Sequence, residues 1–255
     1  MCGRFVATSP PDQIAAYFGA EIAVETLGEN FNVAPTHDVY GVVAPKGGDA
    51  DSTPRLEAFH WGLIPSWAKD RKIASRMINA RSETLAEKPA FKGLFKKKRL
   101  LIPMDGFYEW KVGTAVGPLT AKGKPAKQPM FIHRSDDEPL AVAGLWSAWK
   151  DTDAPPDENG VPRWLHSATV VTTAANETMA PVHDRMPVLV PRSRWVEWLD
   201  PGNDDIESLS TLFDMSADRS LEMYPVSTDV NSVRNNTPEL IDEIDPLSPA
   251  STSLF

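Results

Sequence analysis

The side chain with the most distinctive chemistry in this sequence is Cys2, which directly follows Met1. Removal of Met1, common when the next side chain is small, would leave an α-amine and a thiol on adjacent carbons. Unperturbed pKa values of about 7.7–8.0 for an α-amine and about 8.5 for a thiol give such groups reactive fractions near neutral pH. A 1,2-aminothiol condenses with an aldehyde to an imine and then closes to a five-membered thiazolidine. The alternative is a small cysteine packed near the chain end.

Groups suited to phosphate gather between Asn79 and Thr84, where amide, guanidinium and hydroxyl side chains fall within six residues. Guanidinium, hydroxyl and backbone N–H groups are the usual protein contacts to phosphate. The segment therefore indicates an anion-binding site that includes Arg81. The alternative is the start of a helix, capped by Asn79 or Ser82, with Arg81 in a salt bridge.

A candidate proton-transfer residue, Glu109, stands between the large aromatic residues Tyr108 and Trp110 at the start of an expected strand. Apolar surroundings disfavour the charged form of a carboxylate and suit it to act as general acid or base. The alternative is a strand whose outward face carries Glu109.

A second candidate, His183, precedes Asp184 and Arg185. A histidine can move protons near neutral pH and could pair with Asp184, while Arg185 adds a donor of the type that binds phosphate. The alternative is a surface turn between a helix and a strand.

Two tryptophans, Trp61 and Trp67, bracket an apolar turn that contains proline. Exposed aromatic rings stack on unpaired bases or wedge into a duplex end. Core packing is the competing interpretation, and it is stronger for Trp61 than for Trp67. The basic run from Lys96 to Arg99 is typical of a solvated helix face, although it could extend a DNA-binding surface.

The pattern of apolar residues and turn residues predicts a mixed α and β fold that would position these groups. Expected helices are Pro10–Phe18, with Ser9 as N-cap, Ser82–Leu94, interrupted at Pro89, Arg192–Leu199 and Asp205–Phe213. Expected strands are Gly3–Val6, Asp38–Ala44 paired with Arg55–Gly62, Leu100–Pro103, Gly106–Val112, Met130–His133, Leu140–Trp146, Ala168–Thr173 and Leu221–Val226.

Domain organisation follows from the absence of a clean linker between these strands. We expect one domain over residues 1–244, followed by a Ser/Pro-rich tail, 245–255, that is disordered. The composition of Gly113–Lys127 and Asp151–Pro162 predicts two surface loops. We expect a monomer.

The formal net charge of −9 is unevenly distributed. From Asp200 to Phe255, 12 acidic residues stand against two basic ones, so the first 199 residues carry a formal charge of +1. Whole-chain charge governs solubility and non-specific association rather than what a local groove binds. The acidity therefore does not exclude a nucleic-acid ligand.

Cysteine usage and hydropathy bear on location and cofactors. A single cysteine cannot form an intrachain disulfide, which fits a reducing compartment, and we expect a cytoplasmic protein, nucleoid-associated if bacterial. Five scattered histidines and Cys2 favour no metal site, and we expect no cofactor. No apolar run reaches the roughly 18 residues of a membrane span, and the first residues lack the apolar core of a secretory signal.

Six motifs in this order resemble those of the SRAP family, the SOS-response-associated peptidase-like proteins. They are Met1-Cys2-Gly3-Arg4-Phe5, Asn30-Phe31-Asn32-Val33-Ala34-Pro35, Trp61-Gly62-Leu63-Ile64-Pro65-Ser66-Trp67, Asn79-Ala80-Arg81-Ser82-Glu83-Thr84, Gly106-Phe107-Tyr108-Glu109-Trp110 and His183-Asp184-Arg185-Met186-Pro187. The resemblance runs from Cys2 to about Val230, nearly the whole chain.

This resemblance implies an α+β fold, a single domain with a curved, barrel-like antiparallel β core and flanking short helices. It implies binding to single-stranded DNA and to single-strand/duplex junctions with abasic sites. It also implies a thiazolidine crosslink to the ring-opened sugar, which shields the site, and a lyase-like and peptidase-type chemistry that includes autocatalytic removal of Met1.

Residue by residue, the resemblance implies that Cys2 is the nucleophile and Glu109 the acid/base. Asn79 would orient the N-terminal residue and the sugar, and His183 would assist sugar opening and crosslink reversal. Seven further residues would lie at the DNA interface: phosphate contacts (Arg4, Arg81, Arg185), the pocket floor (Asn32, Pro35) and base-stacking rings (Trp67, Phe107).

Two other classes of function use the same residues. A thiol or N-terminal-nucleophile peptidase acting on other proteins could pair Cys2 with His183. A non-catalytic single-strand binder would show salt-sensitive affinity that is indifferent to Cys2 and to the lesion. The arginine-bearing motifs favour DNA over a protein substrate.

Overall fold

The centre of the fold is a closed ring of five strands in a computed structural model that describes residues 2–45, 53–112, 123, 126–151, 155–156 and 160–246. Around the ring the order is β5 (Arg55–Trp61), β4 (Asp38–Val43), β7 (Arg99–Met104), β10 (Leu140–Lys150) and β11 (Trp164–Ala174). These neighbours pair antiparallel, whereas β11 closes onto β5 in parallel. The expected barrel-like core is confirmed, with that one parallel closure as a difference.

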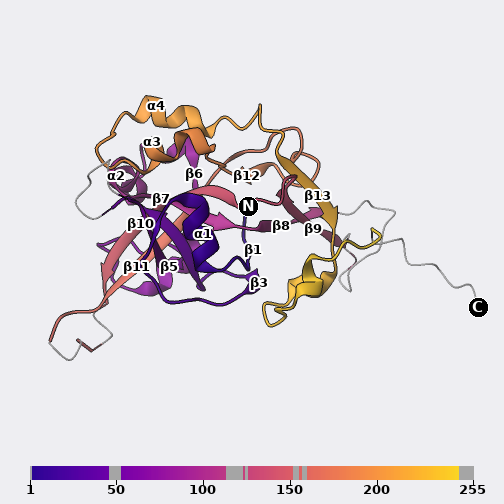
Figure 1. Ribbon diagram of the computed structural model, residues 1–255, viewed down its shortest axis with the longest axis horizontal. Coiled ribbons are helices and arrows are strands. Elements are labelled where there is room, and N and C mark those ends of the chain that lie inside the picture. Colours follow the sequence, from indigo (N-terminus) through magenta and orange to yellow (C-terminus); the bar gives the residue numbers. More distant parts are fainter. Residues whose placement is uncertain are drawn as a thin grey trace, which may run out of the picture.

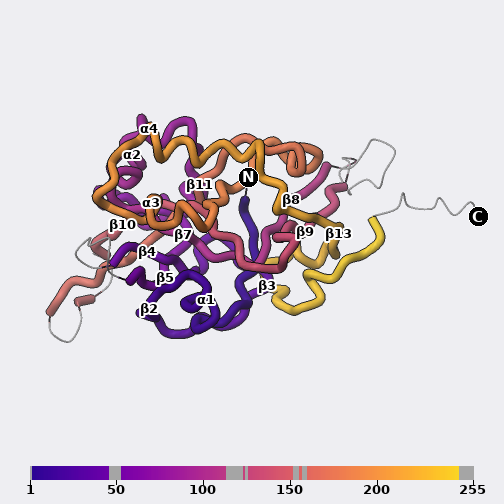
Figure 2. Tube along the Cα trace, turned by 45° about the horizontal axis from the view of Figure 1, so that its top comes forward, coloured from indigo at the N-terminus to yellow at the C-terminus, as the bar shows by residue number. Residues whose placement is uncertain are grey.

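A second sheet lies beside the barrel. Its order is β13 (Leu221–Pro225), β9 (Lys127–Arg134), β8 (Gly106–Val112), β1 (Phe5–Ala7) and β3 (Asn30–Val33), all antiparallel. In two views β10 and β13 lie on opposite sides of the molecule, with the N-terminal end between them (Figures 1 and 2). The first residues of the chain are therefore held between the barrel and the second sheet.

Three short strands extend the barrel sheet. β2 (Glu21–Ile22) pairs with β5, while β6 (Asn79–Arg81) and β12 (Arg185–Pro187) both pair with the last part of β11. β6 runs parallel to β11 and β12 runs antiparallel to it, along its opposite edge. The motifs Asn79–Thr84 and His183–Pro187, about a hundred residues apart in the chain, are thereby brought to one end of β11.

Short helices cover the barrel. They are α1 (Pro11–Phe18), α2 (Pro89–Lys97), α3 (Trp195–Leu199) and α4 (Ile206–Ser210), with 3₁₀ turns η1 (Arg71–Arg76), η2 (Ser82–Thr84), η3 (Arg192–Arg194), η4 (Thr211–Phe213), η5 (Thr228–Asn231) and η6 (Pro238–Ile241). α2, α3 and α4 gather on one side of the molecule (Figure 1). Within the described ranges, no helix has the length and apolar character that a membrane-spanning helix needs.

Two helix starts differ from expectation. Pro10, not Ser9, occupies the N-cap position of α1, because the Ser9 hydroxyl instead donates to Asp105 over 2.6 Å. Pro89 begins α2 instead of interrupting a longer helix. Proline is tolerated in the first turn, where its missing N–H has no intrahelical partner to lose.

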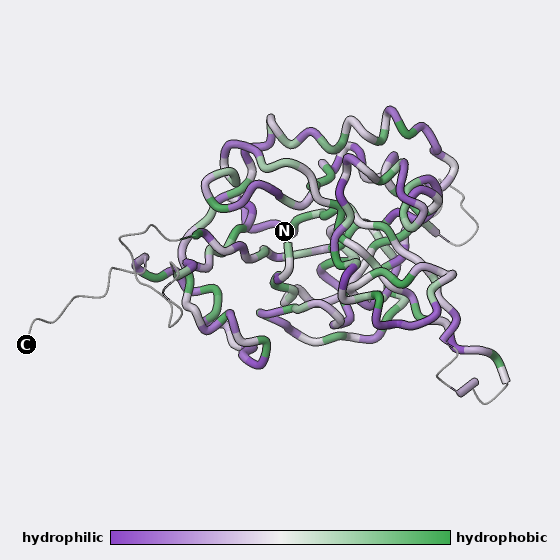
Figure 3. The backbone as a smooth tube through the Cα atoms, turned by 180° about the vertical axis from the view of Figure 1, so that it is seen from behind, coloured by the Kyte–Doolittle hydropathy of each residue, from purple (hydrophilic) through white to green (hydrophobic). Residues whose placement is uncertain are grey.

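Apolar side chains of the barrel strands form most of the core, and the tube coloured by hydropathy shows these stretches inside more hydrophilic turns (Figure 3). The barrel interior is narrow at Gly41, where a Cβ would lie 2.5 Å from Leu100 and 2.8 Å from Phe59. Arg99 is buried as well, and it donates to the carbonyls of Phe95 and Lys96 at the end of α2. Most residues of the two predicted loops, and the tail after Pro246, lie outside the described residues.

Candidate active site

Cys2 is fully buried between the two sheets. Burial raises the pKa of its thiol far above the ordinary value, the negative charge of Glu109 raises it further, and the backbone N–H of Arg4 opposes this only in part. The expected reactive fraction of this thiol near neutral pH is therefore corrected: in the folded chain the thiol is protonated. A protonated thiol in this position needs a base before it can act as a nucleophile.

Glu109 lies on β8, directly beside the N-terminal segment. β1 and β8 pair through Phe5 with Phe107, and continuing this register brings Glu109 level with Gly3, the neighbour of Cys2. Glu109 follows Phe107 by two positions and therefore points to the same side of the sheet. It is 3% exposed, so the alternative of an outward-facing carboxylate is wrong. A buried carboxylate and a buried thiol thus share one space.

Asn79 connects this space to the barrel. It lies on strand β6, opposite Val170 of β11, and not at the helix start that the sequence left open. Its Nδ2 donates to the carbonyl oxygen of Cys2 over 2.8 Å. Its Oδ1 is buried and has no hydrogen-bond donor among the described residues. An acceptor left open in this way is suited to a donor group on a ligand.

His183 is carried to the same end of β11 by the turn that precedes β12. The pairing with Asp184 considered from the sequence is present, with His183 Nδ1 2.8 Å from the carboxylate. The same nitrogen accepts a hydrogen bond from the backbone N–H of Arg185 over 3.0 Å. A backbone N–H can only donate, so this bond favours a neutral ring with its proton on Nε2, whereas the contact with Asp184 favours a proton on Nδ1.

The three arginines assigned to phosphate have different surroundings. Arg81 is exposed at the end of β6. Arg4 is half-buried, its Nη1 donates to Asn32 and to the carbonyl of Val230, and burial lowers its pKa. Arg185 forms an ion pair with Glu83. Of the three, Arg81 is the one that is exposed.

Asn32 does more than form a pocket floor. It is 1% exposed, accepts from Arg4 over 2.7 Å, and donates through Nδ2 to the carbonyls of Ser232 and Asn235 over 2.9 and 2.8 Å. It therefore ties the segment after β13 to the N-terminal strands. These partners were not predicted from the sequence, because backbone carbonyls carry no residue-type signal. Pro35 is half-buried in the turn before β4.

The aromatic candidates separate clearly by exposure. Trp67 is 62% exposed, and it lines a surface hollow with Lys69, Lys72 and Arg76. Phe107 is fully buried in the core, so the expectation that its ring stacks on a base is wrong. Trp61 is also fully buried, and its Nε1 donates to the carbonyl of residue 78.

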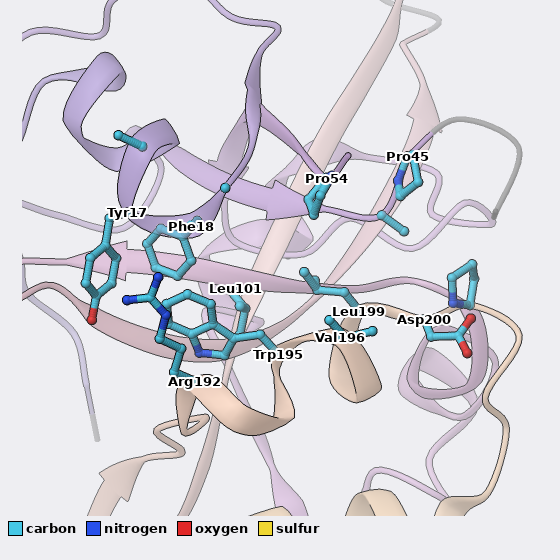
Figure 4. Close-up of a pocket in the computed structure, with 14 residues that line it drawn as sticks. Tyr17, Phe18, Pro45, Pro54, Leu101, Arg192, Trp195, Val196, Leu199 and Asp200 are labelled. Carbon is cyan, nitrogen blue, oxygen red and sulfur yellow. The ribbon is translucent and has the colours of Figure 1, made fainter. Parts of the chain in front are cut away.

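A different hollow, of about 280 Å³, lies between α1 and the α3 region (Figure 4). Its lining includes Tyr17, Phe18 and Trp195, and the Arg192 guanidinium lies 5.5 Å from the ring centres of Tyr17 and Trp195. None of the residues predicted to carry chemistry lines it. This hollow therefore lies apart from the Cys2 cluster, which is identified by its chemistry.

Comparison with known proteins gives matches over almost the whole chain. A family model described as SOS response associated peptidase (SRAP) matches residues 1–233. Abasic site processing protein YoqW of Bacillus subtilis (strain 168) is 40% identical over 244 residues, covering 95% of this chain and 99% of that protein. Abasic site processing protein HMCES of Xenopus tropicalis is 35% identical, covering 77% of this chain and 60% of that protein.

Solved structures share the fold. A protein from Bacteroides thetaiotaomicron aligns with a TM-score of 0.74 at 20% identity, covering 95% of this chain and 100% of that one. A phage-related protein from Bordetella bronchiseptica aligns with a TM-score of 0.62 at 28% identity, covering 89% of this chain and 95% of that one. The arrangement of barrel and second sheet is thus shared with other proteins.

Proposed function

The chain belongs to the SOS response associated peptidase (SRAP) family, and from that membership we propose that it processes abasic sites in single-stranded DNA by bonding covalently to them through Cys2. The relatives named above as abasic site processing proteins support the substrate class. The observation that carries the proposal is the buried cluster of Cys2, Glu109 and Asn79. An abasic sugar supplies the aldehyde that an aminothiol requires.

The first requirement is a free amine on Cys2. While Met1 is attached, the nitrogen of Cys2 is an amide and cannot attack a carbonyl. Met1 lies outside the described residues. We propose that the same cluster removes it: one water is consumed, the peptide bond after Met1 breaks, methionine leaves, and Glu109 moves the proton.

Crosslinking then proceeds with a balanced loss of one water. The Cys2 amine adds to the aldehyde carbon, the resulting carbinolamine loses water, and an imine forms. The Cys2 sulfur adds to the imine carbon as its proton passes to the nitrogen, which closes the thiazolidine. Because burial holds the thiol protonated, Glu109 has a defined task, which is to take that proton and return it to nitrogen.

Sugar opening comes before this chemistry. An abasic sugar is mostly a closed hemiacetal, so one proton must leave its hydroxyl and another must reach the ring oxygen. We propose that His183, with a proton on Nε2, supplies this exchange and assists crosslink reversal. The open acceptor Oδ1 of Asn79 is suited to the amine of Cys2 or the hydroxyl freed by ring opening.

Binding of the DNA strand requires contacts that do not depend on its base sequence. Arg81, exposed at the end of β6, is the strongest candidate for a flanking phosphate, and Arg4 would add positive charge to the site, whereas the charge of Arg185 is neutralised by Glu83. Trp67 offers a ring for stacking, beside basic residues of the same hollow. We propose that the protein acts as a cytoplasmic monomer on single strands and junctions, without metal or cofactor.

The test mixes the processed protein with a single-stranded oligonucleotide that carries one abasic site. A species that resists SDS is expected with the wild-type protein and not with Cys2→Ala. Equal crosslinking by Cys2→Ala would refute the proposal. The arginine-bearing motifs favour DNA over a protein substrate, and turnover of a peptide panel that is lost in Cys2→Ala would instead support a peptidase acting on other proteins.

A further inference from the structure

Glu83, which none of these steps uses, is linked to His183 through Arg185. It lies on η2, just after β6, and its two carboxylate oxygens accept from the two terminal nitrogens of Arg185, Oε2 from Nη2 over 3.0 Å. A fork of this kind fixes the plane of the guanidinium as well as its distance. The hydrogen bond from Arg185 lowers the pKa of Glu83, so the pair is charged at neutral pH.

Arg185 depends on this pairing. Its side chain is 13% exposed, whereas that of Glu83 is 52% exposed. Its Nη2 also donates to the carbonyl of Thr172 over 2.6 Å, and its backbone pairs with Ala174, both on β11. The side chain therefore reaches from β12 across β11 toward the edge that holds β6. Without Glu83, a largely buried guanidinium would lose its carboxylate.

The backbone of the same arginine sets the state of His183. The Arg185 N–H donates to His183 Nδ1 over 3.0 Å, and this bond favours the proton of the neutral ring on Nε2 against the Nδ1 position that Asp184 favours. A shift of Arg185 would weaken this bond, and the ring could then place its proton on Nδ1, facing Asp184 at 2.8 Å. The position of Arg185 thus depends on Glu83, and the choice of protonated nitrogen in His183 depends on Arg185.

We propose that Glu83 is a positioning residue that holds His183 in its Nε2–H form through Arg185. Its consequence for catalysis rests on the function proposed above, in which His183 opens the sugar. The role given to Glu83 is distinct from phosphate contact, because a carboxylate repels phosphate and neutralises Arg185 beside it.

The direct test is nitrogen NMR of histidine-labelled protein, since the two ring nitrogens report which one is protonated. Wild type is expected to show the Nε2–H form of His183, and Glu83→Gln a mixture of both forms. Arg185→Lys keeps the charge but not the fork, and it is expected to give the same mixture. The matched control is Glu87→Gln, an exposed carboxylate with no hydrogen bond or ion pair among the described residues, which should retain the wild-type pattern. A wild-type pattern in Glu83→Gln, or in Arg185→Lys if the first variant does not fold, overturns the proposal.

A kinetic measurement distinguishes a positioning role of Glu83 from a general loss of structure in the variant. Crosslinking to a closed abasic sugar requires ring opening, whereas condensation with propanal does not. Glu83→Gln should slow the first reaction about tenfold and leave the second within about twofold. Equal slowing of both indicates a structural role and overturns the proposal. If wild type reacts with neither substrate, the proposed function fails, while the NMR result still decides the role of Glu83.

Discussion

Asn79 donates from Nδ2 to the carbonyl oxygen of Cys2 over 2.8 Å, which joins strand β6 of the barrel sheet to the N-terminal segment. Its Oδ1, buried in the same place, has no donor among the described residues. One side chain thus holds the main chain of the reacting residue and presents an acceptor beside it. The cluster is assembled by pairing between distant strands, and each member can be tested separately.

Replacing Asn79 by Ala should misplace Cys2 with little loss of stability. The single hydrogen bond contributes about 1 kcal/mol to the free energy of unfolding, whereas misalignment of a reacting group slows reactions about ten- to a hundredfold. Single-turnover crosslinking and urea unfolding measure the two effects. An unchanged crosslinking rate would mean that Asn79 does not position Cys2.

Glu109→Gln should remove the base and also alter the thiol. Loss of proton transfer is expected to slow ring closure about a hundredfold or more. Because the charge of Glu109 raises the pKa of the Cys2 thiol, the variant should ionise at lower pH than wild type. Ultraviolet titration of the thiolate checks the sign. A thiol pKa that stays the same or rises in the variant would contradict the placement of Glu109 beside Cys2.

The buried thiol should make stability depend on pH in the alkaline range. In the unfolded chain the thiol ionises around its ordinary pKa, while in the folded chain it stays protonated to higher pH. The unfolded state therefore releases a proton first, and stability falls above pH 9 by about 1.4 kcal/mol per pH unit from this group. Urea unfolding of wild type and Cys2→Ser from about pH 8 to 10 should give diverging curves, and parallel curves would count against the raised pKa.

Trp67→Ala should weaken DNA binding without affecting the fold. Loss of a stacking platform reduces affinity by about 1–3 kcal/mol, and an exposed ring changes the free energy of unfolding by only about 0.5 kcal/mol. Trp164, 58% exposed and outside the candidate site, is the matched control, since Trp67 is 62% exposed. Fluorescence anisotropy with a labelled single strand measures both variants. Equal losses in the two would show that the effect is not specific to Trp67.

Much of the barrel and of the second sheet could be predicted from the sequence, because several of their strands carry long apolar patterns. Gly106–Val112 has the predicted bounds, and the expected pairing of the strands that begin at Asp38 and Arg55 is confirmed. The short strands β6 and β12 were not predicted, since three residues carry no periodicity and their pairing is imposed by β11. Their polar motifs were interpreted as a helix start or a turn, which is what the local residue types favour.

The sequence indicated which residue types lie together at the candidate site, but it did not indicate how deeply they are buried. Cys2, Asn79 and Glu109 do lie together, but the burial of the thiol could not be inferred from its position in the chain. Phe107 alternates with Gly106 and Tyr108 on a strand, yet all three are buried because both faces of this part of the strand are covered. The pairing of Arg185 with Glu83 joins residues 102 positions apart and leaves no local pattern.

If the amine and the thiol of Cys2 act together, peptide mass spectrometry of the purified DNA adduct will show a single defined product. The N-terminal peptide is expected to lack Met1, to begin at Cys2, and to carry the sugar with the loss of one water. Borohydride, which reduces an imine, is expected to add no hydrogen to the closed ring. An adduct on a lysine, or on a peptide that still begins with Met1, would refute joint action of the two groups.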